Sequence, residues 1–175
     1  DTTVMESGVR ALKRWTGKAS ANIIYDSRVD PFTDQSLSDK VKGKSNIAVV
    51  AFTTEGDVFG GFYSVAVTEQ GNNFADPNMF LFSFESHGRC AAPKRFTVKS
   101  ERRGGANVRF YNNDSDGWFV RFDSGPGWLY LGDQRVGKYC DDLSKGFDGI
   151  ANNTLTGNTY PARFACSRLV AIQLE

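Results

Sequence analysis

The sequence predicts a single, strand-rich globular domain. Its 175 residues are enough for one domain with a core of its own, and few for two. Hydrophobic residues make up 40% of the chain and charged residues 23%, a balance typical of globular rather than disordered proteins. The 14 phenylalanines fall in short clusters rather than at helical spacing, which favours strands.

The N-terminal segment has a helical pattern. Met5, Val9, Leu12 and Trp15 recur at spacings that place them on one side of a helix, and Gly17 follows where that helix should end. A helix this short is marginal by itself, so we expect its apolar stripe to dock on the domain or to continue an upstream region. The opening residues, DTTVMESGVR, contain neither an initiator methionine nor a signal-peptide pattern, so we expect a fragment of a longer chain.

A second helix is expected after the short apolar run at residues 23–28. Pro31 and Thr33 are residues that open helices, and Gly43 is placed to end this one. Its apolar side should carry Phe32, Leu37 and Val41.

The period then changes to that of strands. Residues 47–53 form a continuous apolar run, as expected of a strand buried on both faces. Residues 54–57 supply a turn and residues 58–67 alternate, so the two runs should form an antiparallel hairpin. Gly60 and Gly61 weaken a strand, and they predict a bulge or a close approach of another chain segment.

The rest of the chain continues as short strands. After a loop at residues 69–78, residues 79–84 form a third core strand. Residues 138–151 fit either a short helix or an irregular loop, and no repeat or linker divides the chain. Further strands are expected at residues 96–99, 108–111, 118–122, 128–131 and 169–174. No apolar run approaches the roughly 20 residues that a membrane span needs.

Four segments, in this order, resemble the TLDc domain family. They are the run IIYDSRVDPF at residues 23–32, DVFGGF at 57–62, NMFLFSF at 78–84 and FACSRLVAI at 164–172. The chain departs from the family pattern at Pro31, where the family has a glycine, and in the final strand, which lacks the acidic residues usual between its apolar positions. Residues 89–109 and 133–160 match poorly.

The resemblance implies an α+β, mainly β fold, with a two-sheet antiparallel β-sandwich flanked by short helices. It assigns residues 21–175 to the TLDc-like domain and leaves residues 1–20 as an N-terminal helix. It also implies a role in oxidative-stress protection and binding to the vacuolar-type proton ATPase. It brings no catalytic residue and no cofactor.

The cysteines indicate a reducing compartment. Cys90, Cys140 and Cys166 are far apart, odd in number and without a C-x-x-C pair, so free thiols are expected in the cytoplasm or nucleus. Two glycosylation-type triplets, at residues 113–115 and 152–154, argue weakly for the opposite.

His87 is the single histidine, so any Cys–His or Ser–His–Asp chemistry would have to use it. A nucleophilic Cys140 or Cys166 that meets His87 in space is one alternative. A zinc site is another, because His87 precedes Cys90 at the spacing of a ligand pair. Structural zinc sites draw their ligands in close pairs, and only His87 and Cys90 have that spacing. An exposed loop histidine and unreactive thiols are the favoured interpretation.

Residues 112–117, NNDSDG, match the start of a calcium-binding EF-hand loop. The flanking residues look like strands, whereas an EF-hand needs helices, so an Asn/Asp/Gly hairpin turn is favoured. The candidate calcium ligands are Asn112, Asp114, Asp116 and Asp123.

The best binding candidate is a basic stretch that has a single acidic residue, Glu101. Gly104 and Gly105 should make it a flexible loop, and its charge can steer acidic partners. Solvated surface charge is an equally weighted alternative. Its cations are Arg89, Lys94, Arg95, Lys99, Arg102, Arg103 and Arg109.

We therefore expect a non-enzymatic protein-interaction domain that uses this basic stretch to bind an acidic protein surface, without a cofactor. The alternative is a nucleic-acid-binding regulatory domain, in which Phe96, Phe110 and Tyr111 would stack on bases.

Overall fold

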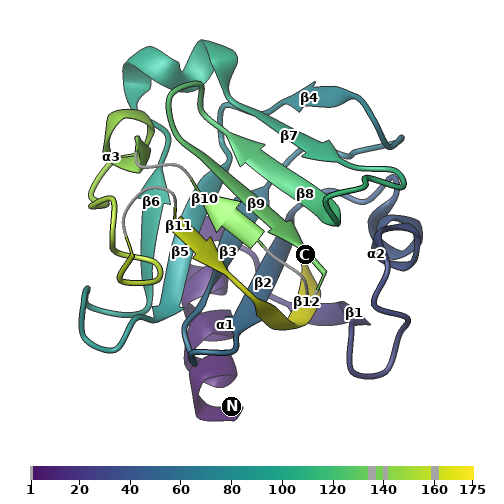
Figure 1. The fold of residues 1–175 in the computed structure, drawn as a ribbon, viewed down its shortest axis with the longest axis horizontal. Coiled ribbons are helices and arrows are strands. Elements are labelled where there is room, and N and C mark those ends of the chain that lie inside the picture. The colour runs from purple at the N-terminus through teal and green to yellow at the C-terminus, as the bar shows by residue number, and fades with distance from the viewer. Residues whose placement is uncertain (1, 134–136, 140–141, 159–161) are drawn as a thin grey trace.

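The computed structural model describes residues 2–133, 137–139, 142–158 and 162–175. Two antiparallel six-stranded sheets lie face to face, as Figure 1 shows, so the predicted mainly β sandwich with short helices is confirmed. None of the helices in these ranges is long and apolar enough to cross a membrane.

The first sheet has the order β1-β12-β2-β3-β5-β6, so the last strand of the chain lies between the first two. Its strands are β1 (Ala21–Asp26), β2 (Ile47–Thr53), β3 (Val58–Tyr63), β5 (Phe80–Glu85), β6 (Lys94–Thr97) and β12 (Cys166–Leu174).

The second sheet has the order β11-β10-β9-β8-β7-β4. Its strands are β4 (Asn73–Ala75), β7 (Asn107–Phe110), β8 (Trp118–Asp123), β9 (Trp128–Gly132), β10 (Gly137–Tyr139) and β11 (Ala162–Phe164).

The helices are α1 (Thr2–Thr16), α2 (Asp34–Val41), the 3-10 helix η1 (Ser100–Gly105) and the single turn α3 (Leu143–Gly146). α1 lies on the outer face of the first sheet, with Leu12 fully buried against it, and α2 packs beside β1 and β8. Because α1 covers the middle of that outer face, β2 is buried on both sides, and every one of its residues is buried as predicted.

The predicted hairpin is confirmed, since β2 and β3 pair antiparallel through the turn at residues 54–57. The glycines of β3 mark close approaches. A Cβ on Gly60 would collide with the carbonyl of Val49, and one on Gly61 would lie 2.6 Å from the Phe122 ring of the opposite sheet. A register irregularity between β3 and β5 lies next to them, at residues 58–59.

Several predicted boundaries were wrong for local reasons. β3 ends at Tyr63 rather than at residue 67, because the backbone N–H and hydroxyl of Ser64 both bind the Asp76 carboxylate and turn the chain away. The predicted loop at residues 69–78 contains β4, which pairs with β7. Phe32 precedes α2, whose N-cap is Thr33, and stacks edge-on against Phe119 of β8.

Two other segments are more ordered than predicted. The expected flexible loop around Gly104 and Gly105 forms η1. The ambiguous stretch at residues 138–151 contains part of β10 and then α3, while Cys140 lies outside the described residues.

Candidate functional site

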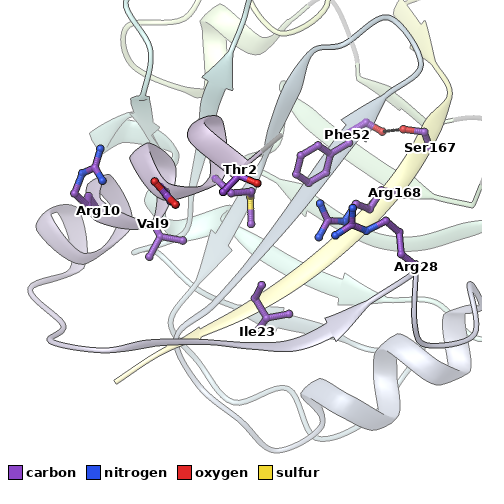
Figure 2. A pocket seen from close by; sticks show the side chains of 10 residues that line it. Thr2, Val9, Arg10, Ile23, Arg28, Phe52, Ser167 and Arg168 are labelled. Atoms are coloured by element: carbon purple, nitrogen blue, oxygen red, sulfur yellow. Dashed lines mark hydrogen bonds between the residues drawn. The ribbon is translucent and has the colours of Figure 1, made fainter.

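A groove of about 730 Å³ opens on the outer face of the first sheet, between α1 and the edge strand β1. Met5 and Val9 line it from α1, Ile23 lines it from β1, and Phe52 of β2 lies at its end. Figure 2 shows Ile23 pointing from β1 toward the helix, and its side chain is 55% exposed. The lining is therefore largely apolar and open to solvent.

The groove ends at a polar cluster of Asp26, Arg28 and Arg168. Arg168 of β12 binds both carboxylate oxygens of Asp26, at 3.0 and 2.7 Å, and its guanidinium lies 4.8 Å from the centre of the Phe52 ring. This hydrogen bonding by Arg168 lowers the pKa of Asp26 below its usual range. Arg28 lies 3.6 Å from the same carboxylate, so two cations share one anion. Sequence reasoning missed this cluster because Arg168 lies 142 positions after Asp26.

A second, polar pocket of about 620 Å³ surrounds His87. His87 Nδ1 lies 2.8 Å from a carboxylate oxygen of Asp57, a residue that is 2% exposed. The same oxygen accepts a 2.6 Å hydrogen bond from Arg89, which neutralises the buried charge. His87 thus has a carboxylate partner, which sequence reasoning missed because Asp57 looked like an ordinary turn residue.

The two cysteines among the described residues, Cys90 and Cys166, do not line that pocket. Cys90 and Cys166 are both free, and Sγ of Cys90 lies 3.5 Å from the Ser86 hydroxyl. Burial raises the pKa of Cys166 to about 12, so this cysteine stays a thiol at neutral pH. Within the described ranges, no group of three or more His, Cys, Asp or Glu residues is arranged to hold a metal ion.

The basic stretch divides into two groups. In the first, the side chains bind the domain itself. Arg89 donates to the carbonyls of Thr154 and Leu155 as well as to Asp57. The other members of this group are Lys94, which donates to the Gly149 carbonyl, Arg95, which donates to the Trp15 carbonyl, and Lys99, which pairs with Asp148. These four cations connect separate segments of the fold.

Arg102 and Arg103 form the second group. Both are exposed on η1, and neither makes a side-chain hydrogen bond or ion pair with any described residue. Arg109 lies elsewhere, on β7, with its guanidinium 5.1 Å from the centre of the Tyr111 ring. The structure therefore leaves Arg102 and Arg103 as the members of the stretch that are available to a partner.

The aromatic residues considered for base stacking are mostly buried. Phe96 and Phe110 face the core between the two sheets, and Tyr111 is partly covered by Arg109. Two of the three rings therefore cannot reach a nucleic acid.

The calcium-like segment is a hairpin turn between β7 and β8, as favoured from the sequence. An Asp114 carboxylate oxygen accepts from the backbone N–H groups of Asp116 and Trp118, an ordinary turn-stabilising use of aspartate. Asp123, the fourth candidate ligand, lies at the other end of β8, about 17 Å away for a strand of this length. The four candidates do not converge on one point.

Fold and surface together define a two-sheet β-sandwich domain with an outer helix, an apolar groove and exposed arginines. The family model of the TLDc domain matches residues 9–124, from the middle of α1 to just after β8. The chain therefore belongs to the TLDc domain family, as its sequence resemblance indicated. No curated protein matches it at a significant level.

Proposed function

We propose that this TLDc domain is a non-enzymatic protein-interaction module of the oxidation-resistance type, and that its partner presents an acidic protein surface. The observation that carries this proposal is the exposed pair Arg102 and Arg103 on η1, in a chain that belongs to the family. Exposed arginines without internal partners can pair with carboxylates at little cost to the fold, because no existing contact is broken.

The vacuolar-type proton ATPase is the partner that we propose within this class. The family membership supports this choice, and the unpaired thiols of Cys90 and Cys166 suit the cytoplasm or nucleus. Oxidative-stress protection would then follow from binding rather than from chemistry at the domain.

The test measures the affinity of the purified proton ATPase for the domain and for the double variant Arg102→Glu/Arg103→Glu. We expect the charge reversal to weaken binding at least about tenfold, because two attractive contacts become repulsive. The control is Lys42→Glu/Lys44→Glu, which makes the same change of charge at exposed positions between α2 and β2. Equal affinities for both variants would reject the proposed contact, and no binding by the parent chain would reject the partner.

The same variants address nucleic-acid binding. A nucleic-acid ligand predicts an affinity that falls steeply with salt for duplex or single strands, and its loss in Arg102→Glu/Arg103→Glu. The inward orientation of Phe96 and Phe110 supports the protein partner instead.

The non-enzymatic part of the proposal has its own test at His87. We expect no hydrolase or peroxidase activity that His87→Ala abolishes. An activity lost on this substitution, and retained in a variant of the exposed Lys42, would overturn that part.

A further inference from the structure

The outer face of the first sheet is covered unevenly. Six strands about 4.8 Å apart span about 24 Å, whereas one helix with its side chains is only about 10–12 Å wide. α1 contacts β5 and β12 and therefore lies over the middle of the sheet. The outer face of the sheet is covered to different extents on the two sides of α1.

On the β6 side, side chains of the domain cover part of the space beside α1 and leave a smaller pocket of about 360 Å³. Trp15 packs edge-on against Phe80, and Arg95 extends over the same ring while donating to the Trp15 carbonyl. On the β1 side, the groove takes the place of such packing. Ile23 and Val29, the two large hydrophobic residues that stand out as exposed among the described residues, both lie on or just after β1.

The charges around the groove are arranged with cations toward its ends. Arg10 of α1 is exposed and has no partner among the described residues. The side chain of Arg28 is 65% exposed, and its contact at 3.6 Å is to an Asp26 carboxylate that Arg168 already binds through both oxygens. Glu6 is the one acidic residue in the lining, so cations outnumber anions there. Figure 2 shows Arg10 and Arg28 on opposite sides of the apolar residues.

We propose that this groove binds an amphipathic helix of a partner protein, whose aliphatic side chains contact Met5, Val9 and Ile23 and whose flanking carboxylates pair with Arg10 and Arg28. A helix fits because packed helices lie about 8–10 Å apart, so a second helix beside α1 would extend the helical layer toward the edge of the sheet. The charge arrangement selects an acidic rather than a basic helix.

This inference rests on the proposed protein-binding function but uses a different surface from η1. The two sites can therefore fail independently, which the variants of each site distinguish.

The experiment is an NMR titration of the chain, labelled at methyl groups and backbone amides, with a synthetic helical peptide. The peptide has about 15 residues, near the shortest length at which an isolated helix is appreciably populated. Leucines are spaced along one face, and glutamates flank that face. A second peptide has lysine in place of every glutamate.

We expect saturable shifts of the methyl groups of Met5, Val9 and Ile23 with the acidic peptide below about 1 mM, and none with the lysine peptide. Arg10→Glu/Arg28→Glu should weaken binding about tenfold, because both charge pairs become repulsive. Ile23→Lys should abolish it and leave the fold intact, since this side chain is mostly exposed. The matched control Arg102→Glu/Arg103→Glu should bind the peptide like the parent chain.

Other results would overturn the inference. Equal binding of both peptides would reject the acidic partner, and shifts confined to the outer backbone edge of β1 would indicate an added strand instead. Shifts of the same methyl groups with protein concentration alone would assign the groove to a second copy of the chain. The absence of saturable shifts would reject the groove as a helix site, and loss of binding in Arg102→Glu/Arg103→Glu alone would place the peptide on η1.

Discussion

The corner around Arg89 and the helix η1 both belong to the basic stretch, yet their arginines have different surroundings. Arg89 is partly buried, binds the carboxylate of Asp57 and reaches two backbone carbonyls of the loop that precedes β11. Arg102 lies on an exposed 3-10 turn and binds no described residue. One arginine connects parts of the fold, and the other is presented to solvent.

The difference shows that nearby acceptors, and not the number of positive charges, determine what a cation does. Asp57 is buried in the turn before β3, and a buried carboxylate is costly unless a cation or hydrogen bonds compensate it. Among the described residues, no carboxylate pairs with Arg102 or Arg103. Substitutions that remove an acceptor or a donor should therefore have effects graded by the burial and the number of the contacts that are lost.

The largest effect is expected at Asp57. Asp57→Asn removes the charge that Arg89 and His87 share and leaves Arg89 without its anion, so the free energy of unfolding should fall by about 3 kcal/mol. Urea denaturation measures it. The control is Asp148→Asn, at a carboxylate that is 58% exposed and pairs with Lys99. If the two substitutions lower the free energy of unfolding equally, the pairing of Asp57 has no special structural role.

Asp26→Asn should lower the free energy of unfolding by less, about 2 kcal/mol at neutral pH, because it removes the charged hydrogen bonds from Arg168. The pKa of Asp26 is lowered in the folded protein, so its contribution is present above about pH 4 and is lost as the pH falls through the lowered value. The parent and the variant should therefore differ in stability at pH 7 and converge in strong acid. A difference that persists unchanged at low pH would contradict this account.

Arg95→Met should lower the free energy of unfolding by about 1 kcal/mol. Methionine keeps much of the apolar contact with Phe80 but loses the hydrogen bond to the Trp15 carbonyl and the cation–π contact. Because this arginine joins β6 to the end of α1, amide hydrogen exchange should speed up in the last turn of α1. Unchanged exchange there would show that Arg95 does not hold the helix.

The smallest effect among the internally bound cations is expected at Lys99. Its ion pair with Asp148 is exposed and 3.3 Å long, so Lys99→Met should change the free energy of unfolding by no more than about 0.5 kcal/mol. Chemical denaturation at low and at high salt checks this. A decrease in the free energy of unfolding of more than about 1.5 kcal/mol, beyond the range for exposed pairs, would show that Lys99 holds the fold as Arg89 does.

The sequence predicts the elements of this fold better than its sites. The apolar run of β2, the hairpin to β3 and the close approach at Gly60 and Gly61 follow from local patterns, because each depends on burial of neighbouring residues. The short strand β4 was missed because it has only three residues and none of them is buried, so it shows no alternation of apolar and polar positions.

The sites depend on pairs that are distant in sequence. Asp26 and Arg168 are separated by 142 positions, and Asp57 and Arg89 by 32. No local pattern links such residues, and the groove exists only because β12 returns beside β1. An aspartate directly before an apolar strand, as at Asp57, was the one available signal.

The central claim is that the basic stretch contains both residues that hold the fold and residues that meet a partner. Its most direct test measures the free energy of unfolding and the affinity for the proton ATPase in parallel, for Arg89→Met and for Arg102→Met/Arg103→Met. We predict that Arg89→Met loses stability, whereas the double variant keeps the stability of the parent chain and loses affinity. A double variant that binds like the parent chain, or that unfolds as readily as Arg89→Met, would contradict the claim.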